Sequence, residues 1–458
     1  MCHHQAPRQP APGRPEEVSV SLTPSGGRTP RQVLALADDL SGAAETAAAL
    51  CLPARIVLGP AATRSPGAGR ALVVDLDTRQ RDADDAARIV REAVRGAGPG
   101  TVLLKKTDSL LRGNLAAETA AYAEGAAGLV IAPALPAAGR TVHDGIVHLR
   151  GQPLHDTDAW RAETRPAPRS VAAALDGTPT AVVPLTAVRA PLPELTGRLR
   201  ALVEAGLTPV CDTESDGDLD AIAAAALGLG PGVRLMGTGG LAAALGRLRP
   251  GTDGPSPVPA PGGVLPLLVV VGTAEPGAAA QIAQLTAAGA RHVALPAELL
   301  AGAAGPVPLT TGPDDAVTVV SVEGSRGIRP GSARQVVAGL ARTVAAVPYP
   351  ADLVLTGGET ARRVLDALGV TELLPVGEIH HGAVHSRTAD GRSVVTRPGS
   401  YGDSGSLLRI ARALRPYQPL VPPLIPAGPP AQVPAPRAEF TAPHPPPPVS
   451  PVPQGEAL

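Results

Sequence analysis

Aromatic residues and lysine are nearly missing from this chain of 458 residues. Aromatic side chains make up 1% of the sequence, and lysine occurs only at Lys105 and Lys106. A core with so few aromatics has to be built from Leu, Val, Ile and Ala, which suits buried parallel strands covered by Ala-rich helices. Because almost every basic side chain is arginine, the single pair of lysines marks a place where a compact ammonium group is useful.

Other absences limit the class of protein. Three cysteines without metal-ligand spacing indicate reduced thiols rather than a disulfide framework. The net charge of -1 and the pI near 6.8 argue against binding to nucleic acid or to an anionic membrane. No stretch of about 20 residues is apolar enough to span a bilayer, and the Pro- and Arg-rich first 30 residues lack a secretion signal. We therefore expect a soluble cytoplasmic protein that acts on small molecules, and the sequence leaves room for a homo-oligomer.

Apolar runs alternate with Ala-rich segments along the first half of the chain. Strand, loop and helix repeated in this order predict an α/β fold with a mainly parallel sheet. The expected strands cover residues 33–37, 55–58, 71–75, 101–104, 129–132, 181–183 and 208–211. The expected helices cover residues 42–52, 82–96, 114–127, 190–205 and 218–228.

A second α/β series follows a segment that cannot hold a regular element. Residues 246–263 read GRLRPGTDGPSPVPAPGG, and proline and glycine at this density are typical of a linker. Beyond it we expect strands at 265–271, 292–295, 316–322, 352–355 and 372–375, and helices at 276–288, 331–346, 358–369 and 403–414. The sequence thus predicts two α/β domains, residues 31–249 and 264–415, joined by a Pro/Gly linker at 250–263, with disordered segments at 1–30 and 416–458.

Two adjacent carboxylates follow the first expected strand. Residues 33–47 read VLALADDLSGAAETA, so Asp38 and Asp39 lie where the strand ends and a helix begins. Ligands of α/β sheets bind beyond the carboxyl ends of the strands, and two acids there can hold a hydroxyl, act as a base or bind Mg²⁺. The alternative is that one aspartate merely caps the following helix.

The two lysines belong to a cluster of polar side chains in TVLLKKTDSLLRGN, residues 101–114. Besides Lys105 and Lys106, the cluster contains Asp108, Arg112 and Gly113. Cations, a carboxylate and a glycine at an expected junction of strand and helix predict an anion site, in which Arg112 could hold a carboxylate in bidentate fashion. The alternative is a pair of surface lysines that cap the strand.

A loop rich in proline and glycine offers further binding groups. After the expected strand at 129–132 the chain reads PALPAAGRTVHDG, which contains Arg140 and Asp144. Loops with fixed turns and polar side chains often bind ligands, so both residues are candidates. No catalytic role is assigned to the nearby His143 and His148.

Three glycine-bearing loops follow strands in the second domain. They contain Gly272-Thr273, Gly357-Gly358-Glu359-Thr360, and Gly399 with Gly402 in the segment RPGSYGDSG. Glycine lets the backbone approach a phosphate, and the free N–H groups at a helix start favour an anion. None of the loops matches a Walker motif or GxGxxG, and glycine is also common in tight turns. Three such loops in one domain nevertheless favour nucleotide binding.

The order of these motifs resembles the four-carbon acid sugar kinase family. The resemblance runs from ADDLSGA and KKTDSLLRGN through APALPAAGRTVHDG and VVGTAEP to TGGETARRVLDALG and RPGSYGD, and it covers residues 32–414. It implies an N-terminal α/β domain that binds a sugar acid and a C-terminal α/β domain that binds ATP, with Mg²⁺. The implied reaction moves a phosphoryl group from ATP to a hydroxyl of a threonate, an erythronate or a 3-oxo-tetronate.

The resemblance also implies roles for individual residues. It assigns the catalytic acid pair to Asp38 and Asp39. The implied sugar-acid site contains Lys105, Lys106, Asp108, Arg112, Gly113, Arg140 and Asp144. The implied nucleotide site contains Thr273, Gly357, Gly358, Glu359, Thr360, Gly399 and Gly402. Neither the metal ligands nor the identity of the base follows from the sequence.

Some residues depart from the family pattern. Ser41, Glu359 and Arg397 keep the hydroxyl, the carboxylate and the positive charge that the pattern has at their positions. Glu275 is different, because a carboxylate near phosphates weakens nucleotide binding unless a cation neutralises it. This residue motivates an alternative in which the protein is a degenerate kinase that senses a ligand.

A second alternative comes from VVDLDT, residues 73–78, which resembles the nucleophile strand of haloacid-dehalogenase-type phosphatases. In that pattern a second aspartate two residues on is followed by a threonine two further on. Here Thr78 directly follows Asp77, and this mismatch argues against the phosphatase.

Overall fold

The computed structural model describes most of the chain between residues 32 and 415. The described residues are 32–60, 67, 69–161, 163–248, 265–273, 275, 277–302, 304–312, 315–323, 332–399 and 401–415. The terminal segments expected at 1–30 and 416–458, and the linker expected at 250–263, lie outside them.

The first half of the chain contributes a run of parallel strands. Their order in the sheet is β2 (Ala54–Leu58), β3 (Ala71–Asp75), β1 (Val33–Ala37), β4 (Val102–Lys106), β11 (Val233–Gly237), β5 (Gly128–Ala132), β10 (Thr208–Cys211) and β9 (Thr180–Val183). In the central register, Ala37 lies opposite both Asp75 and Lys106. The carboxyl ends of β3, β1 and β4 therefore meet at one edge of the sheet, beside the acid pair and the KKTD segment.

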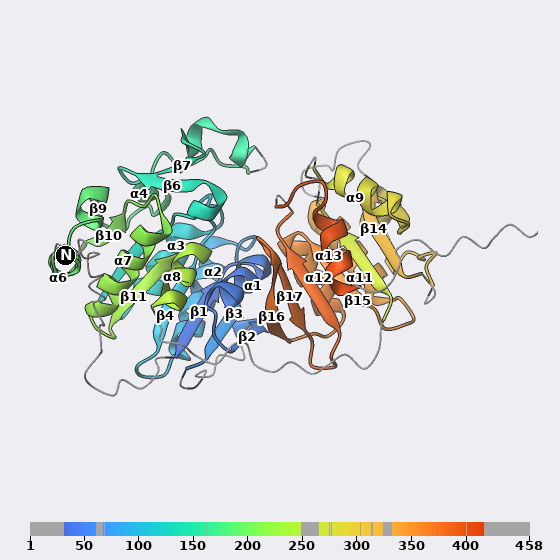
Figure 1. Cartoon of the computed structure of the whole chain (residues 1–458), viewed down its shortest axis with the longest axis horizontal. Helices are drawn as coiled ribbons and strands as arrows, with labels where there is room; N and C mark the ends of the chain where they lie inside the picture. The colour runs from blue at the N-terminus through green and yellow to red at the C-terminus, as the bar shows by residue number, and fades with distance from the viewer. Residues whose placement is uncertain are drawn as a thin grey trace, which may run out of the picture. The chain divides into compact units, whose positions relative to one another are not determined.

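The second half of the chain continues the same sheet. Its parallel strands, in order, are β13 (Arg291–Pro296), β14 (Val317–Glu323), β12 (Leu267–Val271), β15 (Asp352–Thr356) and β18 (Ser393–Arg397), followed by antiparallel β17 (Ala383–Arg387) and β16 (Glu372–His380). β16 then pairs with β2, with Glu372 opposite Val57 and Leu373 opposite Ile56 (Figure 1). The strands named so far thus form one continuous sheet.

Helices cover both faces of the sheet because side chains alternate along each strand. Val33, Ala35 and Ala37 belong to one hydrophobic cluster, and Leu34 and Leu36 to another. The helices that contribute to the first cluster include α1 (Leu40–Ala49), α6 (Leu192–Glu204), α7 (Asp216–Gly228), α8 (Gly239–Arg247), α10 (Ala297–Gly302), α11 (Ala333–Ala345) and α12 (Gly358–Ala367). The opposite face is covered by α2 (Ala83–Arg95), α3 (Leu115–Ala123), α9 (Gly277–Ala287) and α13 (Ser406–Leu414).

A small antiparallel sheet leaves the main sheet after β5. It consists of β6 (Arg140–His143), β7 (Ile146–Leu149) and β8 (Gln152–Pro153), and the short helices α4 (Val171–Ala174) and α5 (Leu185–Val188) follow it. A bridge between Val142 and Thr213 ties β6 to the segment after β10. This bridge fixes the base of the loop that carries Arg140.

The predicted mainly parallel α/β architecture is confirmed. Each expected strand and helix is present, with ends shifted by a few residues. The sequence did not predict β11, β17 or β18, nor the hairpin of β6 and β7. Within the part of the chain that the structure describes, no helix combines the length and the apolar character needed to cross a membrane.

Candidate active site

The acid pair lies at the start of α1, directly after β1. Asp38 is 3% exposed. Asp39 is the N-cap of α1, and its Oδ1 accepts a hydrogen bond of 2.8 Å from the Gly42 N–H. An aspartate at this position satisfies one of the free N–H groups of the helix. The capping role considered as an alternative is therefore present for Asp39, and it leaves Oδ2 for other partners.

Arg79 joins the two carboxylates. It donates to Asp38 from Nε over 2.7 Å and from Nη2 over 3.0 Å, and to Asp39 from Nη1 over 2.8 Å. The backbone N–H groups of Thr78 and Arg79 donate to the Asp38 carbonyl, which holds the loop after β3 against the end of β1. Arg79 is not among the predicted site residues, because its local sequence is ordinary and only the order of the strands brings it to the acid pair.

The two aspartates have opposite pKa shifts. Burial raises the pKa of Asp38, but the positive charge of Arg79, with a smaller share from the two lysines, holds it below its ordinary value. Burial also raises the pKa of Asp39, and the neighbouring Asp38 carboxylate keeps it above its ordinary value despite Arg79. Acids whose pKa values are pushed apart suit a division of roles, in which one stays ionised and the other can take up a proton.

Lys105 and Lys106 extend to opposite faces of β4. Side chains alternate along a strand, so two neighbours in the sequence do not share one face. The Lys105 ammonium is 1% exposed and pairs with Glu118 of α3 at 2.6 Å. The Lys106 ammonium pairs with Glu45 of α1 at 3.2 Å, and it lies 3.1 Å from the point that a Cβ on Gly42 would occupy. The structure thus brings Lys106 to the α1 side, with the acid pair, and engages Lys105 in the interior.

Asp108 and Arg112 form an ion pair within the loop after β4. Arg112 donates to the two Asp108 oxygens from Nε over 2.8 Å and from Nη2 over 2.9 Å. Burial raises the pKa of Asp108, but the guanidinium groups of Arg112 and Arg79 hold it well below its ordinary value. Gly113 has a φ of +90°, and a Cβ there would lie 3.4 Å from an Asp38 oxygen. The fork of Arg112 that was expected to hold a ligand carboxylate is already occupied by Asp108.

Arg140 retains an unused donor. Its Nη1 donates to the Ser109 hydroxyl and lies 3.4 Å from the Tyr401 hydroxyl. Its Nε is buried and has no hydrogen-bond partner among the described residues. A buried N–H group without a partner costs free energy, which a bound carboxylate would recover.

Asp144 lies apart from these contacts. It is exposed in the turn between β6 and β7 and has a φ of +49°. Its backbone N–H donates to Asp212 over 2.9 Å, and the neighbouring Gly145 N–H donates to the same carboxylate. These bonds make Asp144 part of the hairpin turn rather than of the acid pair's surroundings.

The three glycine loops of the second half pack against one another. A Cβ on Gly272 would overlap the Thr360 hydroxyl, and a Cβ on Gly399 would lie 2.5 Å from the Thr273 hydroxyl. Gly357, before α12, has a φ of +96°, a conformation that favours glycine. The predicted nucleotide-site residues Thr273, Thr360, Gly357 and Gly399 are thus brought together.

Gly358 joins the glycine loops to the acid pair. It is the first residue of α12, and a Cβ on it would lie 2.6 Å from Asp39 Oδ2 and 3.1 Å from Ser41 Oγ. The start of a helix has free N–H groups and a partial positive charge. The predicted acid and nucleotide sites therefore adjoin at the start of α12.

Glu359, Gly402 and Glu275 complete the nucleotide side of the chain. Glu359 lines a cavity of about 260 Å³ together with Asp77, Gln80, Arg81, Arg334 and Arg363. Gly402 has a φ of +87°, and its carbonyl accepts a bond of 3.2 Å from Gln281. Glu275, the residue that departs from the family pattern in charge, pairs with Arg161 at 3.4 Å. A cation is therefore available beside this carboxylate.

The VVDLDT segment makes a structural contact. Asp75 ends β3, is completely buried, and pairs with Arg362 of α12 at 2.8 Å. Its other oxygen accepts the backbone N–H of Asp77. Burial, with the negative charge of Asp77, raises the pKa of Asp75 to about 7 against the opposing effect of Arg362. A carboxylate with these partners and no exposed surface is not available to attack a phosphate ester.

Comparisons with known proteins agree with two functional halves. A family model described as a sugar-binding N-terminal domain matches residues 33–245, and one described as a nucleotide-binding C-terminal domain matches residues 268–407. A D-threonate kinase of Cupriavidus necator is 35% identical over 408 residues, which cover 83% of this chain and 97% of the relative. A D-threonate kinase of Bordetella bronchiseptica is 32% identical over 413 residues, which cover 83% and 96%. The predicted bounds of the two domains, 31–249 and 264–415, stay a prediction.

Solved structures share the fold. A crystal structure from Salmonella typhimurium LT2, described as a putative tRNA synthase, aligns with a TM-score of 0.65 and 20% identity over 84% of this chain and 99% of that one. A Haemophilus influenzae protein aligns with a TM-score of 0.61 and 18% identity over 83% and 99% of the two chains. At these identities the likeness concerns the fold alone.

Proposed function

Because the chain belongs to the four-carbon acid sugar kinase family, we propose that it transfers a phosphoryl group from ATP to a hydroxyl of a four-carbon sugar acid. D-threonate is the first candidate substrate, since relatives matched over nearly their whole length are D-threonate kinases. The observation that carries the proposal is the close approach of Gly358, at the start of α12, to Asp39. A kinase has to bring the acceptor hydroxyl in line with the terminal phosphate of the donor. The short distance between Gly358 and Asp39 supports a site where the two substrates lie side by side.

Asp39 is the proposed base. Its raised pKa favours a carboxylate that accepts a proton from the acceptor hydroxyl, and its Oδ2 lies beside the start of α12. Asp38 stays ionised because Arg79 binds both of its oxygens. Arg79 is thus a positioning residue, which fixes the two carboxylates relative to each other. Positioning and electrostatics are what most phosphoryl transfer requires from the protein.

Arg140 is the proposed partner of the substrate carboxylate. It has a free buried Nε, whereas the fork of Arg112 is occupied by Asp108. Lys106 adds positive charge on the side of the acid pair. For Lys105 and Asp144 we propose structural roles, in the interior and in the hairpin turn.

Two buried hydroxyls are candidates for recognising the hydroxyls of the acid. Ser41 Oγ and Thr107 Oγ1 lack hydrogen-bond partners among the described residues. Ser41 follows the acid pair, and Thr107 follows Lys106 at the end of β4. A site that pairs buried hydroxyls with substrate hydroxyls discriminates strongly against acids that lack them.

The glycine loops are the proposed site for the ATP phosphates. Gly272 packs on Thr360 and Gly399 on Thr273 so closely that neither position has room for a side chain, and Gly358 begins α12, where free N–H groups favour a phosphate. Magnesium would be held mainly by the phosphates, whose charge it neutralises, with Glu359 as a carboxylate at this end of α12. Mg²⁺ commonly uses one or two protein carboxylates, which is consistent with the finding that the described residues contain no cluster of three or more candidate ligands.

An assay of acid-dependent ADP release tests this function. The full chain is incubated with ATP, Mg²⁺ and a panel of D- and L-threonate, D- and L-erythronate and 3-oxo-tetronates, and the product is identified by mass. We expect ADP release with D-threonate and a product that is one phosphoryl group heavier. ATP binding without turnover on any of these acids would favour the ligand sensor that Glu275 suggested. Phosphate release from a phosphorylated acid without ATP would favour the phosphatase.

A further inference from the structure

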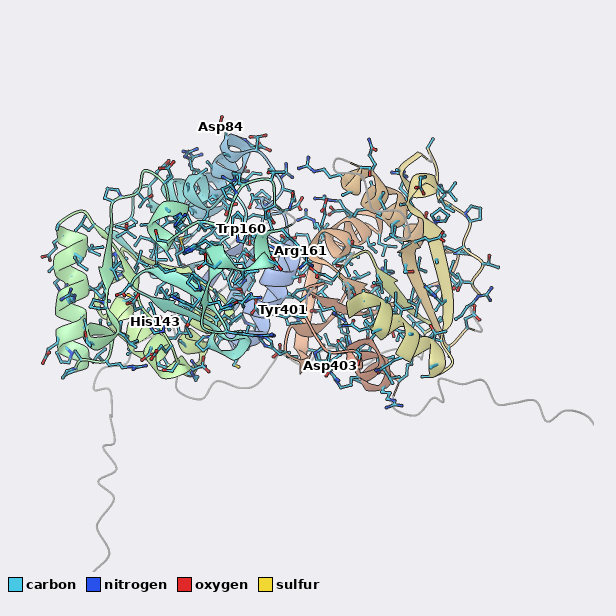
Figure 2. All side chains as sticks on the ribbon, turned by 90° about the horizontal axis from the view of Figure 1, so that it is seen from above. Asp84, His143, Trp160, Arg161, Tyr401 and Asp403 are labelled. Carbon is cyan, nitrogen blue, oxygen red and sulfur yellow. The ribbon has the colours of Figure 1, made fainter. Side chains whose placement is uncertain are left out.

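The aromatic ring of Tyr401, which follows Gly399 in the last glycine loop, is held in place by contacts with two neighbouring residues. The ring stacks on His381 with a centroid distance of 5.3 Å and an interplanar angle of 20°. Gly382, which has a φ of +78°, passes so close beneath the ring that a Cβ there would overlap it. Figure 2 labels Tyr401 near α1, and its surroundings include the charges of Glu45 and Lys106. The ring is therefore held in one orientation, next to the proposed acid site.

Arg397 holds the backbone of the same loop by a hydrogen bond. Arg397, which is 1% exposed, donates to the Tyr401 carbonyl, to Gln281 over 2.6 Å and to Ser406 over 3.1 Å. Gly399 lies between Arg397 and Tyr401 in the sequence and touches Thr273 of the proposed ATP site. A shift of Gly399 on nucleotide binding would therefore act on the Tyr401 ring through the loop that they share.

The hydroxyl of Tyr401 meets Arg140, which comes from the other half of the chain. Arg140 Nη1 lies 3.4 Å from the hydroxyl, and the guanidinium carbon lies 5.7 Å from the ring centroid. A guanidinium within about 6 Å of an aromatic ring is attracted by its electrons. Among the described residues, Ser109 also accepts a hydrogen bond from this guanidinium. Tyr401 therefore supplies a substantial part of what orients Arg140.

We propose that Tyr401 is a positioning residue that couples the binding of ATP to the binding of the sugar acid. ATP in the glycine loops then strengthens the binding of the acid carboxylate to Arg140. The inference rests on the proposed function and deepens it, because it assigns to one side chain the cooperation between the two substrates. Coupling of this kind is reciprocal, and the acid strengthens nucleotide binding by the same factor. It needs only a Tyr401–Arg140 contact that is more favourable when the loop is occupied.

The experiment is a binding cycle on the full chain by isothermal titration calorimetry. The dissociation constant of D-threonate is measured alone and in the presence of saturating AMP-PNP with Mg²⁺, for the wild type and for Tyr401→Phe. We expect the nucleotide analogue to tighten acid binding about 5- to 50-fold in the wild type. In Tyr401→Phe, which keeps the ring and loses the hydroxyl, the factor should fall to about 2-fold or less, while affinity for D-threonate alone changes little.

Two further variants make the result specific. Tyr122→Phe is the control, because the Tyr122 hydroxyl also has a hydrogen-bond partner, the Leu235 carbonyl at 3.1 Å, and its ring lies 5.5 Å from an arginine, Arg234. It should keep the wild-type coupling factor. His381→Ala removes the stacking partner and should reduce the factor to an intermediate value.

The outcomes separate this inference from the proposed function. D-threonate that fails to bind the wild type in either condition contradicts the choice of substrate, and the inference would fall with it. Binding that is unaffected by AMP-PNP in the wild type overturns the coupling alone. Equal weakening of acid binding with and without AMP-PNP in Tyr401→Phe also overturns it, because Tyr401 would then be only an acid ligand.

Discussion

The acid pair at the end of β1 combines two carboxylates with different electrostatic surroundings. Arg79 binds both oxygens of Asp38 but only one oxygen of Asp39. The second oxygen of Asp39 is used to cap α1. Because Asp38 holds the negative charge, protonation is favoured at Asp39, whose pKa burial raises. At the scale of single residues, this asymmetry leads to the assignment of the base.

Asp39→Asn tests that assignment. Asparagine is an equally good N-cap, so the start of α1 should persist, whereas the proton acceptor is lost. We expect kcat to fall about 10²- to 10⁴-fold with little change in the KM for the acid. Steady-state kinetics with the acid identified in the panel measure both parameters.

Asp84→Asn is the control, because Asp84 is an exposed aspartate in the first turn of α2 (Figure 2). A larger loss of kcat in Asp38→Asn than in Asp39→Asn would reverse the assignment.

The candidate site could be predicted from the sequence only in part. Asp38, Asp39 and Arg140 can be proposed from the sequence because each follows an apolar run with a recognisable loop. The sequence predicts one cation cluster from the two lysines, but the period of two along β4 turns their side chains to opposite faces, where Lys105 pairs with Glu118 and Lys106 with Glu45. The contribution of Arg79 depends on long-range strand order, which local sequence does not encode.

At the scale of elements, the first residues of two helices explain why glycine is needed in one place and not in another. Both α12 and α9 begin with glycine, Gly358 and Gly277. A Cβ on Gly358 would meet Asp39 at 2.6 Å, whereas a Cβ on Gly277 would meet nothing within 4 Å. Helix geometry alone would favour alanine at both positions. Close approach to the acid pair is what requires the glycine in α12.

Gly358→Ala should damage activity without unfolding the protein. The added methyl group has to displace the Asp39 carboxylate or the start of α12, and a shift of about 1 Å in a reacting group can cost about a hundredfold in rate. We expect kcat/KM to fall by about that factor while the thermal midpoint changes little. The matched variant Gly277→Ala should keep full activity and gain up to about 1 kcal/mol in the free energy of unfolding. Full activity in Gly358→Ala would show that the contact does not belong to the active site.

The elements themselves were largely readable from the sequence, and three unpredicted strands of the main sheet have a common cause. β11 lies between β4 and β5 in the middle of the sheet, yet its sequence VRLMG is short and runs directly into Thr238 and α8. β17 and β18 follow an antiparallel turn inside a series that otherwise alternates strand and helix. In each case the strand is stabilised by its neighbours in the sheet rather than by a periodic pattern of its own.

At the scale of the whole molecule, ion pairs join the two halves beside the β2–β16 pairing. Arg362 of α12 pairs with the buried Asp75, and Arg363 pairs with Asp77. A more exposed pair joins Arg55 of β2 to Glu372 of β16 at 3.4 Å. Buried and exposed pairs differ in their effect, because removal of one partner leaves an uncompensated charge only where water is excluded.

Asp75 should make the stability of the protein depend on pH. Its pKa is about 7 in the folded protein and near 3.8 when unfolded, so between these values the folded state holds a proton that the unfolded state releases. The free energy of unfolding contributed by this group therefore falls as the pH rises from about 4 to about 7, by at most about 1.4 kcal/mol per pH unit. Urea unfolding at a series of pH values measures the slope. Asp75→Asn, which resembles the protonated form, should remove this part of it, and an unchanged slope would contradict the shifted pKa.

Arg362→Ala should then destabilise the protein more at pH 8 than at pH 5. At pH 8 the wild type gains from the ion pair, whereas the buried Asp75 of the variant has lost the cation that lowers its pKa and stays protonated. The loss in the free energy of unfolding therefore grows by about 1.4 kcal/mol for each pH unit above 7. At pH 5 the same carboxyl is protonated and the loss should be smaller. Arg55→Ala is the control within the same junction, and its exposed pair should contribute about 1 kcal/mol or less at either pH. Equal losses for Arg362→Ala at the two pH values would mean that Asp75 is already ionised at pH 5, and that Arg362 offsets the cost of its burial.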